Sequence, residues 1–187
     1  MKYRSSFLIK IVFIIFLLLL IGFFLIFNTN KHYLLNNLLL ESIVQPKVVN
    51  TQIPVFDLVI PYNSIKIKST SYHGKWLLIR FWATWCSICK EELFLLEKFA
   101  EYFNKKLQIV LISIDEDWNK VNKLFVYPPS VFELGWDRDS KIAKQFKVSK
   151  LPESFLISPE GCILIKFTGF RNWKSKEILK YFHNILD

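Results

Sequence analysis

Two cysteines with two residues between them, Cys86 and Cys89, are the side chains best suited to chemistry in this sequence. They lie in the stretch RFWATWCSICKEE at residues 80–92, where an apolar run gives way to polar residues. The chain has three cysteines, too few for a disulfide-stabilised scaffold. A pair with this spacing has three uses to weigh: a structural disulfide, half of a zinc site, or a dithiol that opens and closes in thiol–disulfide exchange.

The position of Cys86 in the chain favours exchange. Residues 75–83 have the pattern of a buried strand, and a helical pattern starts near Ser87, so Cys86 is expected at a helix amino terminus. Unpaired N–H groups and the helix dipole stabilise a thiolate there, and a thiolate is the reactive form of cysteine. Cys89 falls one turn further along the same helix face. We therefore expect Cys86 to start exchange and Cys89 to resolve the mixed disulfide.

The other two uses of the pair have less support. A zinc site needs about four ligands, and none of the remaining candidates stands at ligand spacing: Cys162, His32, His73 and His183. A structural disulfide between Cys86 and Cys89 would close a very short loop and gain little from loop entropy. The interpretation favoured here needs no metal and no cofactor other than the disulfide itself.

The surrounding elements predict an α/β domain at residues 51–187, a central mixed sheet flanked by helices. Strand, helix and strand alternate after the cysteine pair, which implies parallel strands with helical crossovers. A later hairpin around PEG adds antiparallel edge strands. Asp139 or Ser140 is the expected cap of a short helix. Expected strands cover 53–60, 64–69, 75–83, 107–115 and 131–137, and expected helices start near 87, 118, 139 and 172.

Residues 7–27 predict a membrane anchor. They are apolar apart from Lys10, and a helix of this length covers about 30 Å, the thickness of a bilayer core. The alternative, a cleaved signal peptide, has a shorter apolar region and a small-residue cleavage site, which NTNKHYLL lacks. Basic residues at and before the start of the span make residues 1–6 a cytoplasmic tail. Residues 28–50 are a linker, and the domain then faces the outside of a bacterial inner membrane, where thiols tend to be oxidised.

The net charge of +9 does not point to nucleic acid. The lysines are scattered and mixed with acidic residues, as in EELFLLEKFAEYFNKK, and no basic tract appears. A lysine-rich solvated surface explains the charge.

Two stretches, GKWLLIRFWATWCSICKEE and FKVSKLPESFLISPEG, together resemble the thioredoxin superfamily. The resemblance is strongest to its membrane-anchored, exported branch of TlpA-, ResA- and CcmG-like proteins, and it covers residues 51–187. It implies a thioredoxin-like fold and a redox-active disulfide between Cys86 and Cys89. It also implies that Pro152 is a cis-proline facing this disulfide, with the Leu151 backbone free to pair with an extended substrate. Taken without the motif, Pro152 would be an ordinary strand-edge proline.

The resemblance gives two further side chains a role at the disulfide. Trp85 would cover it, against the alternative of simple core packing. Glu92 matches an acidic residue that tunes the thiols and can relay protons, against the alternative of a solvated carboxylate in the first helical turn.

Three positions depart from the family pattern or lie outside it. Arg80 stands where thioredoxins carry a buried acid, and it could favour a nearby thiolate. Phe94 replaces the helix proline that is common in the family. Cys162 is expected to be a small buried apolar residue.

The function implied by the resemblance is a membrane-tethered protein-disulfide oxidoreductase that reduces disulfides of exported proteins, such as apocytochrome c before haem attachment. A membrane electron donor would re-reduce it. A thiol oxidant or isomerase of the same fold is the first alternative, because the direction depends on the reduction potential. A metal-binding module that uses Cys86 and Cys89 without turnover is the second.

Overall fold

The computed structural model describes residues 17–24, 47–125 and 129–187. The chain divides into two compact units, residues 1–45 and residues 46–187. In the first unit, residues 17–24 are helical. Searched over the described residues alone, the chain has no helix with the length and apolar character needed to cross a bilayer. Most of the predicted anchor at 7–27, the tail at 1–6 and most of the linker at 28–50 lie outside the described residues.

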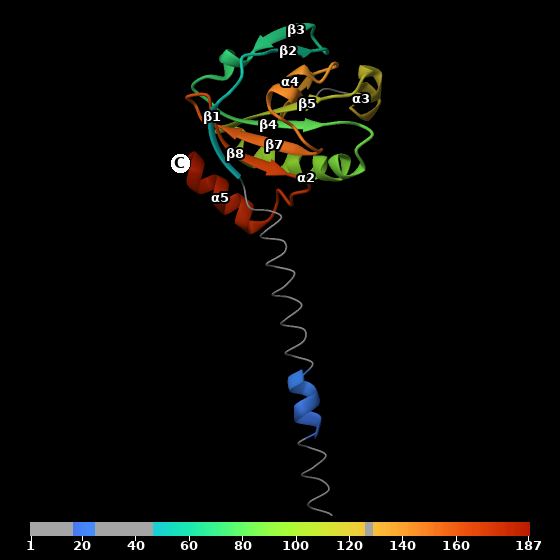
Figure 1. Ribbon diagram of the computed structural model, residues 1–187, viewed down its shortest axis with the longest axis vertical. Helices are drawn as coiled ribbons and strands as arrows, with labels where there is room; N and C mark the ends of the chain where they lie inside the picture. Colours follow the sequence, from blue (N-terminus) through green and yellow to red (C-terminus); the bar gives the residue numbers. More distant parts are fainter. Residues whose placement is uncertain (1–16, 25–46, 126–128) are drawn as a thin grey trace, which may run out of the picture. The chain divides into compact units, whose positions relative to one another are not determined.

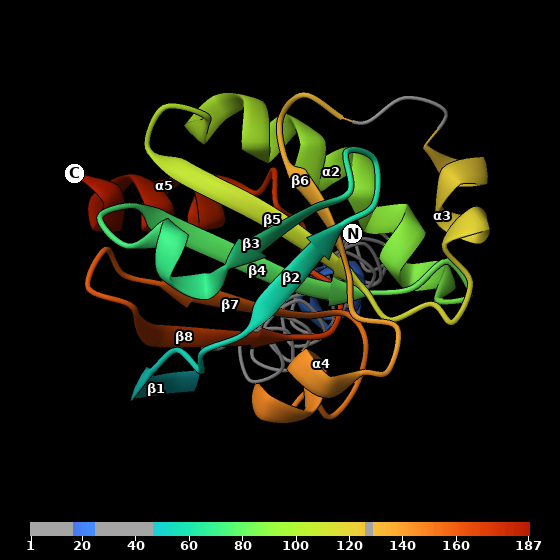
Figure 2. The same cartoon turned by 90° about the horizontal axis from the view of Figure 1, so that it is seen from above.

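The second unit is built on one eight-stranded mixed sheet (Figures 1 and 2). The strand order is β1-β8-β7-β4-β5-β6-β2-β3. Strands β4, β5 and β6 run parallel to one another, and the other neighbouring pairs are antiparallel. The strands are β1 (Lys47–Gln52), β2 (Asp57–Ile60), β3 (Ile65–Lys68), β4 (Trp76–Trp82), β5 (Leu107–Ser113), β6 (Glu133–Trp136), β7 (Glu153–Ile157) and β8 (Cys162–Thr168).

Helices cover both faces of this sheet (Figure 1). On one face, α2 (Ser87–Phe103), α3 (Trp118–Leu124) and α5 (Lys176–Leu186) bury apolar side chains in a common cluster. On the other face, α4 (Lys141–Gln145) and the 3-10 helix η1 (Ser69–Tyr72) pack on a second cluster. Residues of β4 alternate between the two clusters, so this strand is buried on both sides, as central strands of α/β sheets are. The predicted α/β class is confirmed, and so is the predicted order of elements from β4 to α5.

The strand β1 differs from the prediction. Residues 47–50, assigned to the linker, belong to β1, which pairs antiparallel with β8. Its register shifts between Val48 and Thr51, and Asn50 between them adopts a positive φ of 49°. Because β1 covers β8, the hairpin β7–β8 does not lie at the sheet edge, contrary to the prediction. A short polar-flanked strand with an irregular register has little periodicity, which explains why the sequence pattern missed it.

The cap of α4 also differs from the prediction. Ser140 occupies the N-cap position, but its side chain makes no capping hydrogen bond. Instead the buried carboxylate of Asp137 accepts hydrogen bonds from the N–H groups of Ile142 at 3.1 Å and Ala143 at 2.8 Å. Asp137 therefore satisfies two N–H groups that the helix leaves unpaired.

Candidate active site

Cys86 and Cys89 form a disulfide at the amino terminus of α2. Cys86 is the N-cap residue, and the N–H of Cys89 donates a hydrogen bond to its Sγ at 3.3 Å. Cys86 keeps 8% of its surface exposed, whereas Cys89 is fully buried. Of the two cysteines, Cys86 is thus the one that retains any contact with solvent. An N–H group directed at the sulfur also stabilises a thiolate that forms there on reduction.

The loop that carries Cys86 is fixed by a buried carboxylate, that of Asp115. Its two oxygens accept hydrogen bonds from Thr84 N at 2.9 Å and Thr84 Oγ1 at 2.7 Å. Ser113 Oγ donates a third at 2.8 Å. Asp115 follows β5, the parallel neighbour of β4. It therefore lies at the carboxyl end of these strands, where the Cys86 loop begins. We did not predict this residue; the one signal for it is an acidic residue two positions after the buried strand LQIVLIS.

Leu151 and Pro152 lie at the same end of the sheet. The peptide bond between them is cis. Strand β7 begins directly after Pro152, with Glu153 opposite Phe81, so Pro152 lies beside the carboxyl end of β4, from which the Cys86 loop departs. The Pro152 carbonyl accepts a hydrogen bond from Gly169 N at 2.8 Å. Pairing of a substrate with the Leu151 backbone stays a prediction.

A second buried carboxylate, that of Glu153, holds the segment around Pro152. It accepts hydrogen bonds from Ser149 N at 3.1 Å, Ser149 Oγ at 3.1 Å and Thr168 Oγ1 at 3.0 Å. Lys166 neutralises it with an Nζ–Oε2 distance of 2.9 Å. These contacts join residues 149–153 to β8 and fix the start of β7. The sequence placed Glu153 next to Pro152 but gave no indication of these partners.

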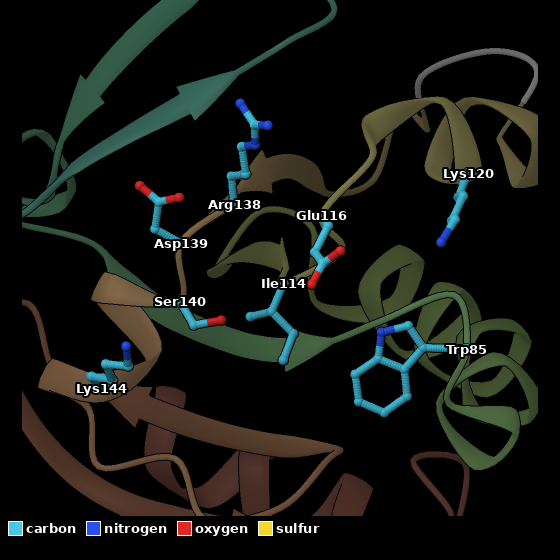
Figure 3. A pocket seen from close by; sticks show the side chains of 8 residues that line it. All are labelled: Trp85, Ile114, Glu116, Lys120, Arg138, Asp139, Ser140 and Lys144. Carbon is cyan, nitrogen blue, oxygen red and sulfur yellow. The ribbon is translucent and has the colours of Figure 1, made fainter.

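Trp85 is 63% exposed, so the alternative of core packing is wrong for it. Its indole ring forms one wall of a groove of about 660 Å³ (Figure 3). The side chains of Glu116 and Lys120 extend towards this groove beside Trp85, and Ile114 lies on its floor. Two further apolar side chains are exposed: Ile88, inside the motif, at 40%, and Phe170, which follows the Gly169 that contacts Pro152, at 41%.

Glu92 is fully buried, so the alternative of a solvated carboxylate is wrong. Its Oε2 lies 2.6 Å from Nη2 of Arg80, and this ion pair is buried on both sides. Its Oε1 accepts hydrogen bonds from Trp173 Nε1 at 2.7 Å and from the backbone N–H of Arg171 at 2.9 Å. Arg80 also donates to Ser154 Oγ at 3.0 Å. The contacts join α2, β4, β7 and the segment before α5.

Burial and the neighbouring opposite charge shift the pKa values of Glu92 and Arg80 in opposite directions. Burial raises the pKa of Glu92, and Arg80, Trp173 and the Arg171 amide oppose that rise. Burial likewise lowers the pKa of Arg80, against the attraction of Glu92. Burial lowers the pKa of the Arg171 guanidinium to about 10. The sequence singled out Arg80 and Glu92 separately, but no local pattern pairs them or includes Trp173.

Cys162 does not belong to this site. It lies at the start of β8, whereas Thr168, opposite Glu153, lies at the other end of that strand. It is partly exposed and free of any disulfide, and Gln52 Nε2 donates a hydrogen bond to its Sγ at 3.0 Å. The expectation of a small buried apolar residue is therefore wrong, because Cys162 is only half-buried. In the part of the chain that the structure describes, no three His, Cys, Asp or Glu residues gather closely enough to hold a metal ion.

Comparisons with known proteins point to one family. The profile of the AhpC/TSA family matches residues 49–165. The chain is 29% identical over 108 residues to thiol-disulfide oxidoreductase ResA of Bacillus subtilis, covering 57% of this chain and 60% of that protein. It is 30% identical over 105 residues to ResA of Bacillus cereus, covering 56% and 61%. The match thus spans about three fifths of the length of these curated relatives.

Solved structures share the fold. A putative thiol:disulfide interchange protein DsbE from Chlorobium tepidum superposes with a TM-score of 0.67 at 22% identity, covering 76% of this chain and all of that one. The exposed lipoprotein thioredoxin Etrx1 of Streptococcus pneumoniae gives a TM-score of 0.60 at 20% identity, covering 70% and 99%. At these identities the likeness concerns the fold alone, and the predicted thioredoxin-like α/β architecture is confirmed.

Proposed function

This chain belongs to the AhpC/TSA family and has a thioredoxin-like fold, and on that basis we propose that it is a protein thiol–disulfide oxidoreductase. One observation carries the proposal: a disulfide at a helix amino terminus in which Cys86 is the N-cap residue and keeps 8% of its surface, whereas Cys89 keeps none. The names of the relatives support the same chemistry.

The exchange starts from the reduced protein. The Cys86 thiolate attacks one sulfur of a substrate disulfide, forming a mixed disulfide and releasing the other substrate sulfur as a thiolate, which takes up a proton. Cys89, deprotonated, then attacks Sγ of Cys86 and releases the second substrate thiol. Two electrons pass from the protein to the substrate, and the protein ends as the Cys86–Cys89 disulfide. A dithiol donor must reduce this disulfide before the next turnover.

The finer proposal concerns compartment and substrate. Residues 7–27 anchor the chain in a bacterial cytoplasmic membrane, with residues 1–6 in the cytoplasm and the catalytic domain outside. The apolar composition of the span and the basic residues at its start support this orientation. The substrates are disulfides of exported proteins, with apocytochrome c the leading candidate, and the electron donor is a membrane protein.

Replacement of each cysteine tests the activity. The full chain, purified in detergent, is assayed for reduction of insulin disulfides by dithiothreitol, alongside Cys86→Ser, Cys89→Ser and the control Cys162→Ser. We expect both motif variants to lose at least about 99% of the stimulated rate, because each removes one of the two exchange steps, and Cys162→Ser to keep it. Full activity in both motif variants would refute the proposal.

A further inference from the structure

The ion pair between Arg80 and Glu92 is unusual in its degree of burial. The two side chains are 1% and 0% exposed, and their charged atoms lie 2.6 Å apart. Removing two charges from water costs free energy that an ion pair often fails to recover, and apolar residues of similar size commonly serve stability as well or better. Stability alone therefore gives no reason for a charged pair at this position.

The pair lies close to the buried cysteine. Glu92 follows Cys89 by three residues on α2, so the two share a helix face and stand about one turn apart. Arg80 reaches Glu92 from β4, and Trp82, two residues further along the same strand, belongs to the buried cluster that contains Cys86 and Cys89. The charges of Arg80 and Glu92 thus act on the cysteines through protein interior, where screening by water is weak.

Other charged or titratable groups face this region from each packed element. Arg171 lies on the segment before α5, and its guanidinium interacts electrostatically with Glu92, Arg80 and Tyr181. Asp115 lies beneath the Cys86 loop and is fully buried. Ser154, from β7, is neutral. Lys90 and Glu91 on α2 are exposed. Of these groups, Arg80 forms the ion pair with Glu92 at 2.6 Å, and Arg171 adds a second positive charge that acts on Glu92.

The face of β4 that meets α2 also has spare hydrogen-bond donors. Among the described residues, neither Arg80 Nε nor Trp82 Nε1 has a hydrogen-bond partner, although both are buried. Buried N–H groups are rarely left without an acceptor. In the oxidised protein the disulfide carries no charge, whereas reduction creates a group that can become a thiolate, an acceptor and an anion.

We propose that Arg80 is a positioning residue that, by neutralising Glu92, sets how readily the cysteine pair ionises and thereby the reduction potential of the disulfide. The inference rests on the proposed exchange function of that disulfide. Reduction adds two electrons and two protons to give two thiols, and ionisation of one thiol releases one proton. Any charge that favours the thiolate therefore stabilises the reduced form and makes the disulfide a stronger oxidant.

Removing the charge of Arg80 and removing the charge of Glu92 must then shift the reduction potential in opposite directions. Glu92→Gln leaves the Arg80 cation uncompensated, which favours the thiolate and raises the potential. Arg80→Met removes the ion-pair partner of Glu92 and leaves only Arg171 to oppose its charge, so an ionised Glu92 disfavours the thiolate and lowers the potential. The double variant Arg80→Met/Glu92→Gln removes both charges and falls between the single variants. Arg80→Lys keeps the cation and stays near the wild type.

The test measures the equilibrium of the full-length protein with glutathione. We expect about a tenfold change in the equilibrium constant for each single variant, in opposite directions, equivalent to about 30 mV for a two-electron couple. The pH dependence of Cys86 alkylation by iodoacetamide, followed by mass spectrometry, should shift to lower pH in Glu92→Gln and to higher pH in Arg80→Met. The controls are Lys98→Met and Glu101→Gln, the partners of an exposed ion pair on the same helix.

Shifts of the same sign in the two single variants, or shifts no larger than those of the controls, would overturn the inference. If Arg80→Met does not fold, the remaining variants test the inference. The inference then requires a higher potential in Glu92→Gln, with Arg80→Lys and the double variant both close to the wild type. The glutathione equilibrium needs no protein substrate, so it remains informative if the insulin assay fails. Insulin reduction with unshifted potentials would refute the role of Arg80 and leave the proposed function intact.

Discussion

Cys86 and Cys89 share one disulfide but differ in what surrounds them. Cys86 caps the helix, receives an N–H from Cys89 and remains partly accessible, while Cys89 is enclosed by the core. The Cys86 side retains the small exposed surface, and the Cys89 sulfur has the Cys86 sulfur as its bonded neighbour. The division of labour between attack and resolution thus follows from exposure and position.

Asp115 provides a prediction at the scale of one residue. Asp115→Asn replaces an acceptor of three hydrogen bonds with an amide whose NH₂ group faces donors. We expect the free energy of unfolding to fall by about 1–3 kcal/mol. Insulin reduction should fall about tenfold or more, because the Cys86 loop loses its fixed position.

The matched control for Asp115→Asn is Asp117→Asn, two residues along the same loop. Asp117 caps α3 by accepting a hydrogen bond from Asn119 N at 3.0 Å, and asparagine serves equally well as an N-cap. Urea unfolding and the insulin assay measure both variants. Equal effects of the two substitutions would mean that Asp115 has no special part in holding the loop.

At the scale of elements, α5 closes the face of the sheet that carries α2. Phe182 on α5 is fully buried, with ring centroids 4.8 Å from Phe99 and 5.9 Å from Phe167. Ser175 caps the helix by accepting a hydrogen bond from Ile178 N at 3.3 Å. The segment before α5 supplies Trp173 to Glu92, so α5 also fixes one side of the buried ion-pair region.

Phe182→Ala should destabilise the second unit by about 3–5 kcal/mol, because it removes a large aromatic side chain from a closely packed core. Urea titration followed by tryptophan fluorescence measures this loss, since all six tryptophans lie between residues 76 and 173. The control Tyr102→Ala removes a ring that is 65% exposed and should cost less than about 1 kcal/mol. A small cost for Phe182→Ala would contradict the packing of α5.

The sequence revealed the local features of this site and not the long-range ones. Cys86, Cys89 and the start of α2 follow from residues that are adjacent in the chain, and the Pro152 assignment came from a family pattern. The partners of Glu92 lie 12 and 81 residues away, at Arg80 and Trp173, so no local periodicity brings them together. Strand β1 was missed for a similar reason: it exists through pairing with β8, more than a hundred residues later.

At the scale of the whole molecule, the proposed anchor and the proposed chemistry support each other. A reductase outside the cytoplasm works among oxidising conditions, where exported proteins acquire disulfides that must be opened. Its electrons must then come through the membrane, which is consistent with a chain tethered there.

The most direct test of this account is to capture the mixed disulfide in cells. The full-length Cys89→Ser protein lacks the resolving thiol, so the intermediate on Cys86 should persist. Acid is added to protonate the thiolates and stop further exchange, and the membranes are then analysed on non-reducing gels and by mass spectrometry. The control is the double variant Cys86→Ser/Cys89→Ser. We predict exported polypeptides joined to Cys86 by a disulfide, all absent from the control. No linked polypeptide, linkage through Cys162 instead, or partners confined to the cytoplasm would contradict the account.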